Sequence, residues 1–185
     1  MLKSRCSLFT VVFLGGLVFP CAAQRFTIPT IPDFPVFSSS GKAFGQLAGL
    51  GCTGAGDPHF SGFSVLSMDM GVQTPSTTAV GSAAGRPYFP DIHINKPLDD
   101  CTPLMFAQLA SGKHIATATI TVLDGSNNQL FVVALKEVFL TSQQLAESGG
   151  GISENLSLAF GQITMTHVPS GKTSGWDVLA NKALP

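Results

Sequence analysis

The chain has 185 residues, and only 11% of them are charged, with 10 Lys or Arg against 11 Asp or Glu. No run of basic residues occurs, so the sequence lacks the positive surface by which proteins bind DNA, RNA or anionic lipid. A chain of this length corresponds to one ordinary domain, and its 44% of apolar residues are enough to build a buried core.

The N-terminal residues 1–23 have the pattern of a cleavable secretory signal. Lys3 and Arg5 precede an apolar run from Leu8 to Phe19, and the small residues that follow suit cleavage after Ala23. The apolar run is shorter than an ordinary membrane span. We therefore expect a secreted or periplasmic protein with no stable membrane insertion after signal removal. The alternative is an N-terminal anchor that is left uncleaved.

Residues 24–41 are predicted to be an extended, proline-rich linker. Pro29, Pro32 and Pro35 recur at every third position, a spacing that favours polyproline II geometry and prevents helix and strand pairing. The Ile and Phe residues between the prolines either dock on the following domain or bind an aromatic groove elsewhere. Residues 42–185 then form the folded domain.

The first two strands of this domain are predicted at Lys42–Leu47 and Gly62–Met70, with a glycine-rich segment between them. In the second strand Phe63 and Val65 alternate with Leu66, so both faces carry apolar residues. A strand with two apolar faces is typical of a buried position, and we expect most of this strand to be buried. A third strand is predicted at Pro90–Lys96.

Residues 102–112 carry the signals of a short helix. Thr102 is a good N-cap residue, and Pro103 suits the first helical position, where its missing N–H costs nothing. Gly112 can adopt the left-handed conformation that ends a helix. These signals predict a helix from Pro103 to Ser111.

Three more strands are predicted after the helix. The first is Ile115–Leu123, and a turn at Gly125–Gln129 leads into Leu130–Ser142. The last strand follows the loop Gly149–Gly151. Its apolar residues change parity near Gly161, where a β-bulge would bring all of them to the core face. They are Leu156, Leu158, Phe160, Ile163 and Met165.

Several motifs of this region occur in a recognisable order. Thr102-Pro103 opens the helix, Ser111-Gly112-Lys113-His114 closes it, and Leu135-Lys136-Glu137-Val138, Glu154-Asn155-Leu156 and Trp176 follow. With these motifs, the sequence from Ala43 to Leu184 resembles the haemolysin-coregulated protein (Hcp) family of type VI secretion. The similarity is strongest between Pro103 and Met165.

The resemblance implies a mainly β fold, an Hcp-like β-barrel of two sheets with one short flanking α-helix. It also implies self-association into rings, in the family hexamers, which stack into a tube and carry small protein cargo. In this interpretation His114 lies where a cation meets the dipole of the helix C-terminus. Lys136 and Glu137 are charges at a rim or a subunit contact.

Candidate catalytic and metal-binding residues are few. Asp91 and His93 share a strand face, but an exposed polar pair is the simpler interpretation, because no third ligand of matching spacing follows. Asp57 and His59 are interpreted as part of a solvated turn, and Glu137 as a surface charge rather than a catalytic acid. The sequence has no nucleophile elbow, phosphate loop or dinucleotide motif. We expect no enzyme activity, no cofactor and no metal.

Cys52 and Cys101 are the cysteines that remain after removal of the leader. In an exported protein such a pair favours one disulfide, which would pin the glycine-rich segment to the start of the helix. The alternative is two free buried thiols.

Two functions remain open. One is a ring-forming structural protein of the type VI secretion tube. The other is an exported, stand-alone module for binding or adhesion that has the same domain.

Overall fold

The computed structural model describes residues 42–53, 60–74, 85–148 and 151–185. The predicted leader (1–23), the predicted linker (24–41) and the pair Asp57 and His59 lie outside the described residues. Within the described residues the chain is mainly β, with nine strands, one α-helix and a 3₁₀ turn at Val168–Ser170. The mainly β class with one helix is therefore confirmed.

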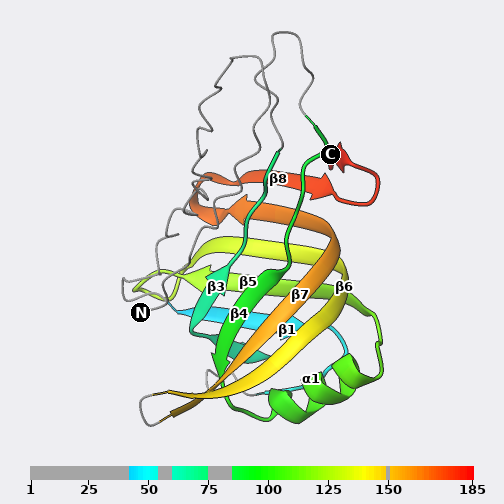
Figure 1. Cartoon of the computed structure of the whole chain (residues 1–185). Helices are drawn as coiled ribbons and strands as arrows, with labels where there is room; N and C mark the ends of the chain where they lie inside the picture. Colours follow the sequence, from blue (N-terminus) through cyan, green and yellow to red (C-terminus); the bar gives the residue numbers. More distant parts are fainter. Residues whose placement is uncertain (1–41, 54–59, 75–84, 149–150) are drawn as a thin grey trace, which may run out of the picture. The chain divides into compact units, whose positions relative to one another are not determined.

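All the described strands belong to one antiparallel sheet with the order β2-β1-β5-β6-β7-β4-β3, in which β8 pairs with β7 and β9 with β8 (Figure 1). The resemblance implied two sheets. The difference arises because β7 is long: its first part pairs with β4, its last part pairs with β8, and β6 runs along most of its length. The bounds are β1 Ala43–Leu47, β2 Phe63–Val65, β3 Ser67–Asp69, β4 Ile92–Pro97, β5 Ile115–Leu123, β6 Gln129–Ser148, β7 Gly151–His167, β8 Lys172–Asp177 and β9 Lys182–Ala183.

The strand predicted at Gly62–Met70 is divided in two by Leu66. Its first part, β2, pairs with β1, and its second part, β3, pairs with β4. Phe63 and Val65 are buried as expected, but Leu66 is 60% exposed and Ser67 and Asp69 are exposed too, so the prediction of a largely buried strand was wrong from Leu66 onward. The reason is that the chain changes partner strand at Leu66, whose N–H donates to the Asn95 carbonyl at 2.8 Å.

The other predicted strands are present, and some of them begin or end at different residues than predicted. The strand Ile115–Leu123 has the predicted bounds, and β1 differs from its prediction by its first residue. The strand predicted at Leu130–Ser142 extends to Ser148, because its polar second half pairs with β7 as a long hairpin. In the turn before it, the Asp124 carboxylate accepts hydrogen bonds from the N–H groups of Ser126 and Asn128.

The predicted bulge near Gly161 is absent from the β6–β7 pairing, whose register is unbroken there and shifts instead between Leu140 and Ser142. Both strands change their buried face at this level without a shift in register. The buried residues pass from Leu135 to Val138 on β6 and from Leu158 to Ile163 on β7, and Glu137, opposite Gly161, has a φ of 53°. The expected core residues of β7 are nevertheless all buried or packed against the core.

The helix α1 runs from Cys101 to Ala110, at the end of the sheet where the β6–β7 hairpin projects (Figure 1). It starts before the predicted Pro103 and ends as expected, with Gly112 at a φ of 61°. Met105 faces the core and is wholly buried. The sheet supplies the rest of the main cluster, including Phe63, Ile92, Ile94, Ile120, Val133, Leu135, Leu156 and Leu158.

Candidate functional site

Two charged side chains among the described residues are wholly buried, Lys96 on β4 and Glu154 on β7. Both occupy interior positions of their strands, where Lys96 follows Ile94 and Glu154 precedes Leu156. The β4–β7 register places the two residues opposite each other. A charge without access to water needs a partner of opposite charge and further hydrogen bonds, and this pair has both.

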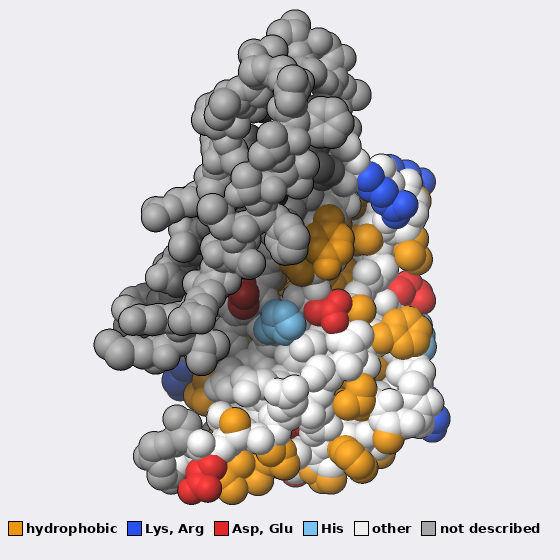
Figure 2. All heavy atoms as spheres, in the orientation of Figure 1, with side chains coloured by type: hydrophobic (Ala, Val, Ile, Leu, Met, Phe, Trp, Pro, Cys, Tyr) orange, Lys and Arg blue, Asp and Glu red, His pale blue; other side chains and the backbone are white. Residues whose placement is uncertain are grey.

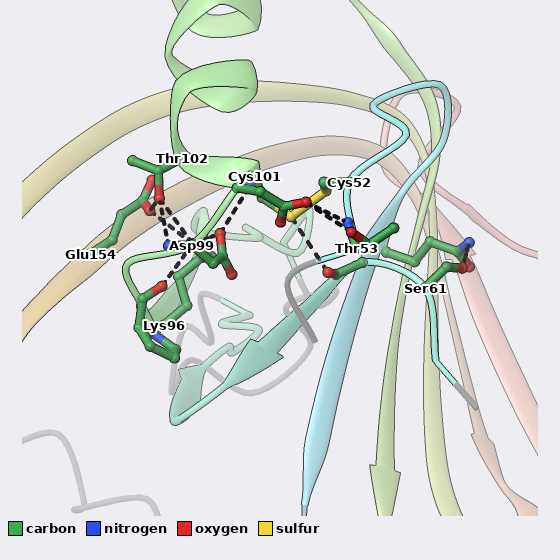
Figure 3. The surroundings of a disulfide bond; sticks show 12 residues. Cys52, Thr53, Ser61, Lys96, Asp99, Cys101, Thr102 and Glu154 are labelled. Atoms are coloured by element: carbon green, nitrogen blue, oxygen red, sulfur yellow. Dashed lines mark hydrogen bonds and ion pairs between the residues drawn. A yellow bond between two sulfur atoms is a disulfide. The ribbon is translucent and has the colours of Figure 1, made fainter. Parts of the chain in front are cut away.

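The three protons of the Lys96 ammonium group face four neighbouring acceptors, of which the Thr102 hydroxyl is the farthest, at 3.3 Å (Figure 3). Nζ lies 2.9 Å from Oε2 of Glu154, 2.7 Å from Oδ1 of Asp99 and 2.8 Å from the Pro97 carbonyl oxygen. It also lies 5.8 Å from the centre of the Phe63 ring. The cation is thus enclosed where β4 passes into the helix.

Glu154 connects this ion pair to two other elements. The Thr102 hydroxyl donates to Oε2 at 2.6 Å, and the Gln143 amide donates both to Oε1 of Glu154 and to the Thr102 carbonyl. Oδ2 of Asp99 and Oε1 of Gln143 are buried without a hydrogen-bond partner. The network therefore joins β4, β6, β7 and the first turn of α1.

The start of α1 corrects the predicted role of Thr102. The N-cap position is Asp100, which makes no side-chain cap bond, and Asp99 accepts the Cys101 N–H through Oδ1 at 2.9 Å. Thr102 lies inside the first turn, and its hydroxyl is used by Lys96 and Glu154 instead. The cap prediction was wrong because an interior ion pair competes for the hydroxyl, and no local signal reveals it.

A disulfide joins Cys52 to Cys101, with Cα atoms 5.1 Å apart, beside this network (Figure 3). Next to it the Asp100 carboxylate accepts hydrogen bonds from the backbone N–H and the hydroxyl of Thr53, both at 3.0 Å. The Thr53 N–H, followed by the Thr53 hydroxyl, lowers the pKa of Asp100. The segment after β1 is thereby fastened to the start of α1.

This arrangement suits a structural role. Lys96 and Glu154 have no exposed surface, so neither can meet a substrate. Asp99, Asp100 and Cys101 lie close enough to suggest a metal site, but the Cys101 sulfur is in the disulfide and Asp99 is paired with Lys96. These residues do not fit a metal ion. Among the described residues no helix has the length and apolar character needed to cross a membrane.

The family-like motifs after α1 come together on the surface. His114 Nε2 lies 2.7 Å from Oε2 of Glu137, and the His114 ring is 5.2 Å from the Phe139 ring. The partner of His114 is thus a carboxylate of β6, in addition to its place beside the helix end. Lys113 and Lys136 are exposed.

The other candidate residues have separate partners. Asp91 accepts a hydrogen bond from Thr141, whereas His93 Nδ1 lies 2.9 Å from the Ser157 hydroxyl. The two residues therefore do not form the acid–base pair that their spacing suggested. Asn155 on β7 accepts from the Asn95 amide at 2.8 Å.

Trp176 on β8 is partly buried against the main core cluster. Its indole Nε1 is buried without a hydrogen-bond partner. The residue therefore contributes packing.

Sequence reasoning missed Lys96, Asp99 and Gln143. A signal was present for Lys96, because Ile92, Ile94 and Lys96 alternate on one face of a strand that is otherwise apolar there. A charge at such a position indicates a buried partner. No comparable signal exists for Gln143, which lies among polar residues of β6.

Three comparisons relate this chain to known proteins. A family model described as "Type VI secretion system effector, Hcp" matches residues 54–167. Protein hcp1 of Pseudomonas aeruginosa is 33% identical over 84 residues, which cover 43% of this chain and 52% of that protein. The chain thus spans about half the length of the curated relative that it matches.

Solved structures give the same picture at the level of the fold. The structure of Hcp1 from Salmonella typhimurium has a TM-score of 0.68 and 22% identity, and the match covers 79% of this chain and 100% of that one. A type VI secretion system effector from Yersinia pestis has a TM-score of 0.62 and 18% identity over 74% of this chain and 99% of its own. At these identities the structures show a shared fold.

Proposed function

This chain belongs to the Hcp family of type VI secretion, and we propose that it is a non-enzymatic structural protein that self-assembles into rings and carries small protein cargo. The observation that carries the proposal is the family match at residues 54–167, which spans β2 to β7 and α1. The fold likeness to Hcp1 of Salmonella typhimurium over that whole chain supports it.

We propose further that the sheet curves round into a barrel. Its two end strands, β2 and β3, are separated along the chain by Leu66 alone. The Leu66 N–H donates to Asn95 of β4, so the backbone continues from the β1 side to the β4 side through one residue. Such closure would leave few unpaired edges, which limits unwanted strand pairing between copies.

A surface for subunit contact is available at the β6–β7 hairpin. The interior face of the sheet continues past Lys96 and Glu154 as Leu98, Ile152 and Leu145, which we call the hairpin patch. These side chains are 46%, 54% and 59% exposed. Hydrophobic side chains gather at this end of the molecule, around the hairpin and α1 (Figure 2). Exposed apolar groups of this kind are typical of association surfaces.

The alternative function, an exported module for binding or adhesion, has its own support. The predicted leader at residues 1–23 and the Cys52–Cys101 disulfide both favour a chain that matures in an oxidising compartment. In that case the same domain would act without a tube.

The oligomeric state distinguishes the two. Light scattering coupled to size-exclusion chromatography, at micromolar concentration, should give about six subunits per particle if the subunits close into a ring by heterologous contacts. Dilution should shift the particle toward smaller species. A strictly monomeric protein at every concentration would reject the ring and leave the stand-alone module.

A further inference from the structure

The Cys52–Cys101 disulfide joins two parts of the structure, one of which has many other contacts with the domain and the other few. On one side is the start of α1, where Cys101 is the first helical residue. On the other side are residues 48–53 and 60–62, which we call the loop arms. The two arms contact each other through the Gly62 N–H, which donates to the Cys52 carbonyl at 3.1 Å.

The helix side has anchors that do not involve sulfur. Asp99 accepts the Cys101 N–H at 2.9 Å, and the Thr102 hydroxyl donates to the buried Glu154 at 2.6 Å. The Gln143 amide donates to the Thr102 carbonyl at 3.0 Å, and Met105 is wholly buried in the core. Breaking these contacts would leave buried polar groups without partners, which opposes release of the helix.

The first loop arm is held more weakly than the helix. Apart from the disulfide, the Ala48 N–H donates to the Thr117 carbonyl at 3.0 Å, and the half-buried Leu50 packs against the core. Cys52 itself is 6% exposed and fixes the first arm to the core.

The hydrogen bonds from this arm to the helix run through Thr53 to the exposed Asp100, where water competes for both partners. Gly49 and Gly51 have φ values of 84° and 66°, so this arm also gains much conformational freedom if it is released.

The loop arms surround a hollow of about 370 Å³. Its walls include Gly51, Cys52, Thr53, Ser61 and Gly62, with Gln46 of β1 behind them. The amide of Gln46 donates to the Ser61 hydroxyl at 2.7 Å, which holds the second arm to β1. The shape of the hollow therefore depends on whether the first arm is held by its sulfur.

We propose that the disulfide is a redox-controlled lock on the first loop arm, residues 48–53. In the oxidised protein this arm is held against α1 and the hollow is formed. In the reduced protein the first arm is released and the hollow is lost, while the second arm stays on β1 and α1 stays in place on its buried ion-pair network. The surface that the protein offers then differs between an oxidising compartment and a reducing cytosol.

The chemistry is thiol–disulfide exchange with a dithiol reductant. One reductant thiolate attacks one sulfur of the Cys52–Cys101 bond; this bond breaks, the other cysteine leaves as a thiolate, and a mixed disulfide forms. The second reductant thiolate then displaces the attacked cysteine as the reductant closes its own disulfide. Two electrons pass to the protein, and the two cysteines end as thiols after taking up two protons. Because both sulfurs are buried, the arms must open transiently before the reductant can enter.

Hydrogen–deuterium exchange followed by mass spectrometry tests the lock on the whole purified chain. Three samples are compared: the oxidised protein, the protein reduced with dithiothreitol, and the double variant Cys52→Ser/Cys101→Ser. We expect amides of the first loop arm to exchange at least about tenfold faster in the last two samples, and amides of Cys101–Ala110 to change by less than about threefold. Adding dithiothreitol to the double variant should change neither segment.

Two results would overturn the proposal. One is unchanged protection of the first loop arm after reduction and in the double variant, which would mean that its other contacts hold it. The second is equal loss of protection in the first arm and in α1, including loss by global unfolding, which would mean that the helix depends on the sulfur bond. The readout is local, so it does not depend on whether rings form.

Discussion

The Nζ atom of Lys96 lies 2.9 Å from Oε2 of Glu154, and neither side chain has any exposed surface. The two residues face each other in the β4–β7 register, and the Thr102 hydroxyl at the start of α1 donates to the same carboxylate oxygen. The Glu154 carboxylate thus forms the ion pair and links β4, β7 and the start of α1. This relationship makes the stability of the hairpin end depend on paired charges.

Removal of the lysine should therefore cost more than removal of the glutamate. We expect Lys96→Met to lower the free energy of unfolding by about 3–5 kcal/mol, because the carboxylates of Glu154 and Asp99 both lose their cation. Glu154→Leu should cost less, because Lys96 keeps its ion pair with Asp99 at 2.7 Å. Urea unfolding of the two variants and of the natural protein measures the difference.

The matched control is Lys136→Met, the same change at an exposed position of β6. It should alter the free energy of unfolding by less than about 0.5 kcal/mol. If Lys96→Met is as mild as this control, the buried pair does not stabilise the fold.

The fold was predictable from sequence for some strands. Ile115–Leu123 has the predicted bounds: it pairs with β6 along its length and with β1 from Ala118 to Val122, and the alternating residues Ala118, Ile120 and Val122 are buried. The break at Leu66 was not predictable. There the chain changes partner strand and leaves Leu66 exposed. A sequence with apolar residues on both faces of a strand looks the same whether such a leucine is buried or exposed.

The candidate site, too, was predictable from the sequence only in part. The helix signals at Thr102 and Pro103 placed α1 closely, but the first turn begins at Cys101, because Asp99 accepts its N–H and the Thr102 hydroxyl serves a distant glutamate. The partners of Lys96 come from positions far along the chain. Such pairing depends on sheet register, which one sequence does not specify.

The Asp100–Thr53 contact should make stability depend on pH. Hydrogen bonds from the Thr53 N–H and hydroxyl lower the pKa of Asp100 in the folded protein. A lowered folded pKa contributes stability above the unfolded pKa, about 3.9, and this contribution is lost as the pH falls through the folded value. We expect Asp100→Asn to be less stable than the natural protein at neutral pH and to approach it below about pH 3.9.

Thermal unfolding from pH 2 to 7 would show this convergence, with Asp69→Asn as a control that removes an exposed carboxylate from β3. A difference between Asp100→Asn and the natural protein that stays constant over the whole range would contradict the assigned cause.

Gly45 allows the Phe63 ring to lie directly against the backbone of β1. The two residues are cross-strand partners, and a Cβ at position 45 would overlap the Phe63 ring, which is 1% exposed and cannot move aside. We expect Gly45→Ala to lower the free energy of unfolding by about 1–3 kcal/mol, as overpacking does. Gly71→Ala, where a Cβ meets open space, is the control and should be nearly neutral. Equal stabilities of the two variants in urea would exclude the overlap.

The predicted leader determines the residue at which the mature chain should begin. Cleavage after Ala23 follows from Lys3, Arg5 and the apolar run before it. The protein recovered from the periplasm or medium should have an intact mass that begins at Gln24. A product that keeps residues 1–23 would rule out cleavage and support the anchor.

Association of the protein should depend on the hairpin patch. Ile152 is 54% exposed and lies opposite Glu147 in the β6–β7 register. The variant Ile152→Lys replaces the apolar contact with a charge, and the opposite charge of Glu147 helps to keep the hairpin itself paired. We expect its apparent dissociation constant for self-association to rise at least about tenfold, because one buried apolar side chain contributes about 1.5–3 kcal/mol.

The control is Gln144→Lys, which adds the same charge at an exposed polar position of β6, where Gln144 pairs with Asn155. It should associate as the natural protein does, since no apolar group is lost. Sedimentation velocity over a range of concentrations measures both variants. If Ile152→Lys and Gln144→Lys weaken association equally, charge and not the hairpin patch governs the contact, and if neither weakens it, the subunits meet through another surface.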